Sequence, residues 1–265
     1  MAIITVSRGS FSRGKEIAEK VAERLNYECI DRETLIEVSE QFNIPEIKLV
    51  RAIHDAPSFL DRYTYGRERY IAYIKAALLR QVRKDNVVYH GLAGQFLLRE
   101  IPHVLNVRII SDWEDRVALE MERENISRRE AERILKNDDE ERRKWSKHLY
   151  GIDTANPSLY NLVLHIKPPL TPDDAVDIIC YTVGLPKFKA TDQSQQALED
   201  LLLASEVKVA LIDLKPDIDV LAKDGIVLVK TKAHITQEAY LAHKIREAGG
   251  HIPGVKEINV DVKVR

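Results

Sequence analysis

The stretch of sequence that decides the fold covers residues 2–25 and reads AIITVSRGSFSRGKEIAEKVAERL. Residues 2–6 are apolar, partly β-branched and too few for a helix, which predicts a buried strand. Over residues 14–25, apolar side chains recur at helical spacing with Lys, Glu and Arg opposite them, which predicts an amphipathic helix. Between the two, Gly9 to Lys15 fits the pattern G-x-x-x-x-G-K.

The loop between this strand and this helix has the features of a phosphate-binding loop. Its glycines let successive backbone N–H groups converge on a phosphate, while the helix N-terminus and Lys15 add positive charge. A plain turn before a surface helix is the alternative, and the flanking strand and helix favour phosphate binding over it. The residues expected to contact phosphate are Gly9, Ser10, Phe11, Ser12, Arg13, Gly14, Lys15, Glu16 and Ile17.

The residue after Lys15 departs from the pattern. A Ser or Thr normally stands there, with its hydroxyl on Mg²⁺, but this chain has Glu16. A magnesium ion must therefore be held in another way or weakly, and its protein ligands are unknown from the sequence.

Strands alternate with helices through residues 1–186. Further strands are expected at residues 27–30, 86–89, 104–110 and 162–166. Helices are expected between them, at 46–54 and 67–84 among others, and over 172–183. Such alternation predicts an α/β fold with a parallel sheet covered on both faces.

A polar stretch, residues 187–196, is expected to be a linker to a second domain at 197–265. There, a helix over 197–205 is followed by short alternating segments around 207–214, 227–229 and 258–264, with a helix at 236–248. This pattern predicts a small α+β unit.

Composition excludes several classes of protein. The chain has 265 residues with 40 Lys+Arg against 42 Asp+Glu, so it is not a globally basic nucleic-acid binder. Two cysteines exclude a disulfide framework and a cysteine zinc site. No apolar run reaches the roughly 20 residues of a membrane span, and no secretory signal is recognisable. We expect a cytoplasmic location.

Residues 6–18 and 27–33, VSRGSFSRGKEIA and YECIDRE, together resemble the cytidylate kinase-like family of P-loop nucleoside monophosphate kinases. Matching segments at 107–110, 114–116, 150–153 and 157–163 extend the resemblance over about residues 1–185. It implies a P-loop kinase with a parallel five-stranded sheet flanked by helices. Such a kinase transfers the γ-phosphoryl group of ATP, with Mg²⁺, to a nucleoside monophosphate, CMP or dCMP first among them.

The resemblance also implies an acceptor site and a lid. Asp31 and Arg32 would help to bind the acceptor, with Arg62, Arg67 and Arg69 from an insertion at about 46–84; ordinary surface solvation is the alternative for these three arginines. The lid is expected at about 123–147, a segment dense in charge that otherwise reads as an exposed helix with i,i+4 pairs. Besides Lys15, the expected catalytic residues are Arg142, then Arg116, Arg123 and Arg143.

Two positions depart from the related kinases. His90 and Leu92 stand where an Asp and an Arg are expected, and Leu92 cannot contact phosphate as a cation. Together with Glu16, they leave two other readings open. One is a catalytically weak nucleotide-sensing module, and the other is a small-molecule kinase on the same fold.

Residues 197–265 resemble a BON domain in the segments 218–220, 224–231 and 252–258. The resemblance implies a binding role, with a protein partner or self-association expected. A phospholipid surface is less expected because lysines and arginines are not in excess there. The alternative is a generic α+β domain that only packs or dimerises.

Overall fold

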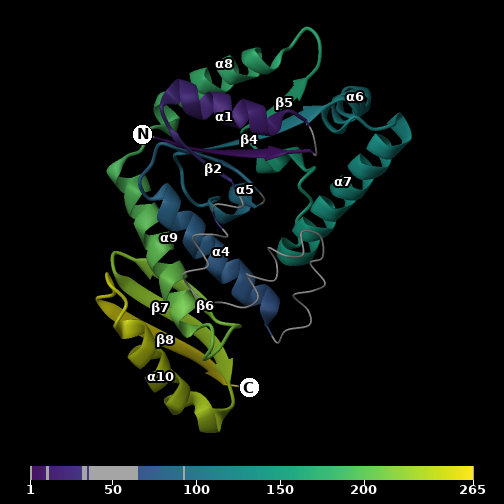
Figure 1. The fold of residues 1–265 in the computed structure, drawn as a ribbon. Coiled ribbons are helices and arrows are strands. Elements are labelled where there is room, and N and C mark those ends of the chain that lie inside the picture. Colours follow the sequence, from purple (N-terminus) through teal and green to yellow (C-terminus); the bar gives the residue numbers. More distant parts are fainter. Residues whose placement is uncertain (1, 10–11, 32–34, 36–64, 92, 265) are drawn as a thin grey trace. The chain divides into compact units, whose positions relative to one another are not determined.

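The computed structural model describes residues 2–9, 12–31, 35, 65–91 and 93–264 (Figure 1). The expected helix at 46–54 and the expected site residues Ser10, Phe11, Arg32 and Arg62 lie outside the described residues, as does Leu92. The described chain divides into two compact units, residues 2–35 with 84–190 and residues 65–83 with 191–264.

The first unit is built on a parallel sheet of five strands in the order β2-β3-β1-β4-β5 (Figure 1). The strands are β1 (Ile3–Arg8), β2 (Glu28–Asp31), β3 (Val87–His90), β4 (Val104–Ser111) and β5 (Leu162–Ile166). This confirms the predicted α/β fold. The central strand β1 is longer than the predicted 2–6 because its parallel pairing with β4 continues to Arg8, opposite Ile109.

Helices α1 (Gly14–Leu25) and α8 (Pro172–Val183) lie side by side on one face of this sheet (Figure 1). The predicted bounds of both helices are confirmed. Ile17 and Val21 of α1 are fully buried in one core with Ile179 of α8 and with Ile4 and Val107 of the sheet. This packing fixes the N-terminus of α1 at the carboxyl end of β1.

Two further helices form a hairpin between β4 and β5. Helix α6 (Trp113–Glu124) ends at Asn125, which takes a left-handed backbone conformation. Helix α7 (Arg128–Tyr150) begins after Ser127, whose hydroxyl accepts a hydrogen bond from the Glu130 N–H. Val117, Ala131 and Leu135 form their shared apolar core. The charged segment 123–147 is therefore mostly the second arm of a helical hairpin. A short helix, α5 (Gly94–Leu97), follows β3.

The second unit combines α4 (Gly66–Val82) and α9 (Asp192–Leu211) with a sheet of three strands and α10 (Glu238–Gly250). Strands β6 (Asp219–Lys223) and β7 (Ile226–Ala233) form an antiparallel hairpin, and β8 (Glu257–Val264) pairs in parallel with β7. The predicted second, smaller sheet at the C-terminus is present. Its core includes Val207, Val227, Val229 and Ile245.

Helix α9 corrects two expectations. It begins at Asp192, inside the stretch expected to be a linker, because Thr191 and Ser194 form a capping box. It also runs through residues 207–211, where strand-like alternation was expected. Leu203, Val207 and Leu211 are buried at intervals of four residues, and this spacing places them on one face of the helix.

Helix α4 covers the second half of the segment expected to be the acceptor-binding insertion, and it groups with α9. Arg80 pairs with Glu206 and Arg83 with Glu199, at 2.8 and 2.7 Å between side-chain atoms. Within the described part of the chain, no helix is both long enough and apolar enough to cross a bilayer.

Candidate functional site

The described residues of the glycine loop are fastened to β4. The Gly9 N–H donates to the Ile109 carbonyl at 3.3 Å. The buried Ser12 hydroxyl donates to the Gly9 carbonyl oxygen at 3.0 Å and to the Ile109 carbonyl oxygen at 3.2 Å. Arg13 takes a left-handed conformation at φ 60° and leads directly into α1. The loop is thus held at the carboxyl edge of the sheet, at a helix N-terminus suited to an anion.

Gly14 is required where α1 passes β1. A Cβ atom added at Gly14 would lie 2.6 Å from Cβ of Arg8, which is too close for any side chain there. The absence of a side chain therefore lets the first turn of α1 lie against Arg8.

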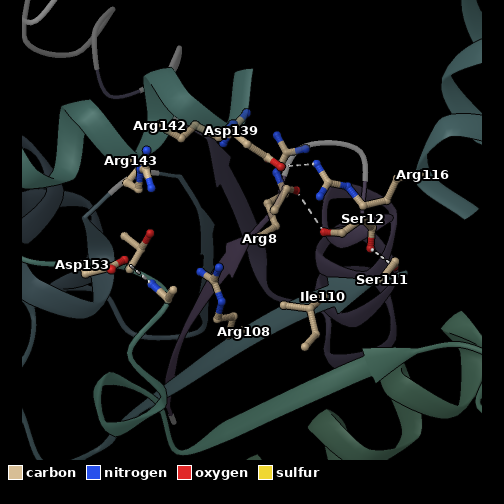
Figure 2. A pocket seen from close by; sticks show the side chains of 13 residues that line it. Arg8, Ser12, Arg108, Ile110, Ser111, Arg116, Asp139, Arg142, Arg143 and Asp153 are labelled. Carbon is tan, nitrogen blue, oxygen red and sulfur yellow. Dashed lines mark hydrogen bonds and ion pairs between the residues drawn. The ribbon is translucent and has the colours of Figure 1, made fainter. Parts of the chain in front are cut away.

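Beside the loop lies a cavity of about 280 Å³, drawn in Figure 2. Its walls come from β1, β4, α6, α7 and the loop after α7. Five of the described arginines line it: Arg8, Arg108, Arg116, Arg142 and Arg143. The lining carboxylates are Asp139 and Asp153. Positive charge is in excess, so the cavity suits an anionic group such as phosphate.

Several of these arginines are held by neighbouring side chains. Arg116 has an exposed side-chain fraction of 11% and pairs with Asp139 at 2.8 Å, Nη2 to Oδ2. Its guanidinium also lies over the Trp113 ring. Arg108 donates to the Tyr160 hydroxyl at 3.3 Å. Positive charge is therefore positioned before any ligand arrives.

The expected site residues divide into two groups. Gly9, Ser12, Arg116, Arg142 and Arg143 meet at the cavity. Arg123 is not among the residues that line it, and it pairs instead with Glu120 and Glu124.

The other described residues of the expected phosphate loop are also not among those that line the cavity: Arg13, Gly14, Lys15, Glu16 and Ile17. Lys15 is exposed and lies 3.8 Å from Glu19, whereas the Ile17 side chain is fully buried in the core. Glu16 pairs with Lys20 at 3.1 Å and with Arg13 at 3.5 Å. Any contact of Ile17 with phosphate would have to come from its backbone, whose N–H donates to the Arg13 carbonyl.

The expected acceptor residues are spread over both units. Asp31 ends β2, where it is paired in register with His90 of β3. Arg67 and Arg69 lie on α4 in the second unit, and Arg69 pairs with Asp213 at 2.8 Å.

His90 is buried at the end of β3, and its Nδ1 atom has no hydrogen-bond partner in the structure as described. Burial lowers the pKa of His90, and the nearby positive charge of Arg8 lowers it further. A neutral imidazole therefore stands at the carboxyl edge of the sheet.

Sequence reasoning missed Arg8 and Arg108 as cavity residues. A signal for each exists, because Arg8 directly precedes the glycine loop and Arg108 interrupts the otherwise uncharged strand 104–111. Neither signal identifies a cavity residue unless the order of the strands in the sheet is known.

The residues that the structure describes offer no group of three or more His, Cys, Asp or Glu side chains that could hold a metal ion. Glu16 is engaged with lysine and arginine. A site for Mg²⁺ made by protein side chains alone does not fit these residues. Magnesium typically keeps several waters and binds through substrate phosphates, which the cavity can accommodate.

A parallel five-stranded sheet with a glycine loop between β1 and α1, and arginines on a helical hairpin beside it, defines the class of P-loop kinases. Within that class, the chain belongs to the cytidylate kinase-like family, whose family model matches residues 3–168. The family and the fold support a phosphotransferase.

Comparison with solved structures finds several that are similar to this chain. An uncharacterized protein from Eubacterium ventriosum is 19% identical, with a TM-score of 0.54 over 69% of this chain and 98% of its own. A shikimate kinase from Bacteroides thetaiotaomicron is 11% identical, with a TM-score of 0.42 over 69% and 99%. A gluconokinase from Sinorhizobium meliloti is 13% identical, with a TM-score of 0.42 over 69% and 95%. No curated protein matches the chain in sequence.

Proposed function

We propose that the chain transfers the γ-phosphoryl group of ATP to a nucleoside monophosphate, CMP or dCMP first among them. The observation that supports this most is the set of five arginines around the cavity beside the glycine loop. Phosphoryl transfer needs fixed positive charge around the transferring group, because that charge spreads over its oxygens in the transition state. The choice of a pyrimidine acceptor rests on the family.

The residues have separate roles in this proposal. Lys15 and the loop amides hold the phosphates of ATP. Arg142 and Arg143, from a lid at about 123–147, stabilise the transferring group together with Arg116 of α6. Asp31 and Arg32 help to place the acceptor, and Arg8 at the end of β1 and Arg108 within β4 bind phosphate. Mg²⁺, bound to the phosphates, would neutralise part of their charge. No covalent enzyme intermediate is needed.

An acceptor panel tests the proposal. ADP formation is measured with ATP and Mg²⁺ on CMP, dCMP, UMP, AMP and GMP, and on shikimate and gluconate as acceptors that are not nucleotides. We expect turnover with CMP or dCMP that is lost in Lys15→Ala and kept in Lys187→Ala, an exposed lysine outside the cavity. Turnover only with a non-nucleotide acceptor would overturn the nucleotide assignment and select a small-molecule kinase.

A second candidate is a nucleotide-sensing module, and the pairing of Glu16 favours it. The residue that replaces the magnesium-binding hydroxyl is tied to Lys20 and Arg13, so the loop lacks the usual metal contact. In this case ATP would bind with no turnover on any acceptor of the panel. The C-terminal unit would then be the effector.

For that unit we propose a BON-like binding module that takes a protein partner or a second copy of the chain. Its expected start after residue 196 falls inside α9, and the boundary between the two compact units lies after Ala190, so the module would include the whole of α9. Light scattering across a range of protein concentrations tests self-association. A constant monomer mass would exclude a second copy and leave the protein partner.

A further inference from the structure

We infer that Tyr160 is a positioning residue of this site, whose hydroxyl holds Arg108 and the loop after α7 against the end of β1. The inference rests on the proposed function, because it assumes that the cavity binds phosphate. Tyr160 itself is not among the residues that line the cavity.

The Tyr160 hydroxyl is a junction between four parts of the first unit. It donates to the Thr154 carbonyl at 2.9 Å and lies 3.1 Å from Oγ of Ser7. It also lies 3.3 Å from Nη1 of Arg108 and 3.3 Å from Nε2 of Gln95, both of which donate to it. These partners belong to the loop after α7, β1, β4 and α5.

Arg108 is restrained on two sides by this tyrosine. The hydroxyl accepts from Nη1, and the guanidinium carbon lies 5.6 Å from the centre of the ring. Ser7 adds a further acceptor at 3.4 Å. Figure 2 shows the Arg108 side chain rising from β4 into the cavity. A guanidinium that is already ordered loses less conformational freedom when an anion binds, so this restraint favours affinity.

The same hydroxyl also holds a wall of the cavity. Asp153, Thr154 and Ala155 line it, and the Asp153 carboxylate accepts from the Ala155 N–H at 2.9 Å. The bond from Tyr160 to the Thr154 carbonyl ties this short loop to Ser7, two residues before Gly9. One hydroxyl thus sets the distance between the loop and the strand that leads to the glycine loop.

The test uses Tyr160→Phe in the full chain, because this change removes only the oxygen and leaves the ring beside Arg108. Binding of inorganic phosphate and of ATP is measured by calorimetry. We expect affinity to fall about tenfold, since a hydrogen bond to a charged group is lost. In turnover, the KM for ATP should rise more than kcat falls. Tyr181→Phe, at an exposed position on α8, is the matched control and should leave both unchanged.

A double-mutant cycle separates positioning from mere support of the fold. If Tyr160 acts through Arg108, Tyr160→Phe should cost much less phosphate affinity in an Arg108→Ala background than in the wild type. Equal costs in both backgrounds would overturn the inference. If Tyr160→Phe lowers the unfolding midpoint, the variant Arg108→Lys is measured in its place. We expect it to lose about tenfold in phosphate affinity as well. An Arg108→Lys variant with undiminished phosphate affinity would overturn the inference.

The outcomes also separate this inference from the proposed function. A wild-type protein that binds ATP and phosphate, with a Tyr160→Phe variant that binds them equally well, overturns the positioning role alone. A wild-type protein that binds neither overturns both. A wild-type protein that binds ATP but has no turnover overturns the kinase proposal, while the calorimetric test of Tyr160 stands.

Discussion

Arg116 on α6 and Asp139 on α7 form an ion pair of 2.8 Å on the wall of the arginine-lined cavity. The carboxylate therefore holds one of the cations that a phosphate group would contact. A bound phosphate must compete with Asp139 for Arg116, and the two negative charges repel each other.

Replacing this carboxylate should strengthen anion binding. We predict that Asp139→Asn raises the affinity for ATP about three- to tenfold at low salt, with a smaller gain at high salt because of screening. Calorimetry at two ionic strengths measures this. Asp177→Asn, which removes an exposed carboxylate on α8 outside the cavity, is the control. Weaker binding in Asp139→Asn would mean that the pair serves to hold Arg116 in place for the ligand.

Two arginines of the hairpin, Arg142 and Arg123, should differ in their importance for turnover. Arg142 lines the cavity, whereas Arg123 pairs with Glu120 and Glu124 away from it. We predict that Arg142→Ala lowers kcat by about 100-fold or more, as expected for a cation on the transferring group. Arg123→Ala should change kcat by less than about threefold, because Arg123 is not among the residues that line the cavity. Equal losses of kcat in the two variants, measured in steady-state assays, would contradict this prediction.

Gly14 should be intolerant of the smallest side chain. A Cβ there meets Cβ of Arg8 at 2.6 Å, so Gly14→Ala must displace either the strand end or the first turn of α1. We predict a loss of about 1–3 kcal/mol in the free energy of unfolding, together with weaker phosphate binding. Urea denaturation measures the first and calorimetry the second. Gly250→Ala, where nothing lies within 4 Å of the added carbon, is the control and should not destabilise. A stable Gly14→Ala that binds phosphate normally would contradict this account of the loop.

His90 should make stability depend on pH. Its pKa in the folded state is lowered by burial and by Arg8, below the ordinary value of about 6.5 expected in the unfolded chain. The unfolded state therefore binds more protons below about pH 6.5, so acidification lowers the free energy of unfolding, whereas above pH 7 this effect vanishes. We predict that His90→Asn flattens the loss of stability between pH 7 and 5. His251→Asn, at an exposed position, should keep the wild-type slope. A His90→Asn slope equal to that of the wild type would show that the imidazole does not titrate in this way.

Much of the first unit was predictable because its signals are local. The bounds of α1 and α8 follow from helical spacing, and the parallel sheet follows from the alternation of strands and helices. The prediction failed at residues 207–211, where alternating apolar residues also satisfy a spacing of four, and packing selects the helix.

The composition of the cavity was less predictable because it depends on strand order. Arg108 contacts Ser7, 101 positions away in the chain, only because strand β4 pairs with strand β1. Arg116 and Arg123 illustrate the same limit on one helix. They stand seven residues apart, roughly 10 Å along the axis, and only Arg116 lines the cavity.

Phosphorus NMR of a mixture of ATP, Mg²⁺, CMP and the wild-type protein tests the proposed kinase activity most directly. It resolves the phosphorus signals of donor, acceptor and both products in one sample. We predict that ADP and CDP form in equal amounts and that neither forms with Lys15→Ala. ADP that appears with inorganic phosphate and no CDP, or unchanged ATP in the presence of bound nucleotide, would contradict it.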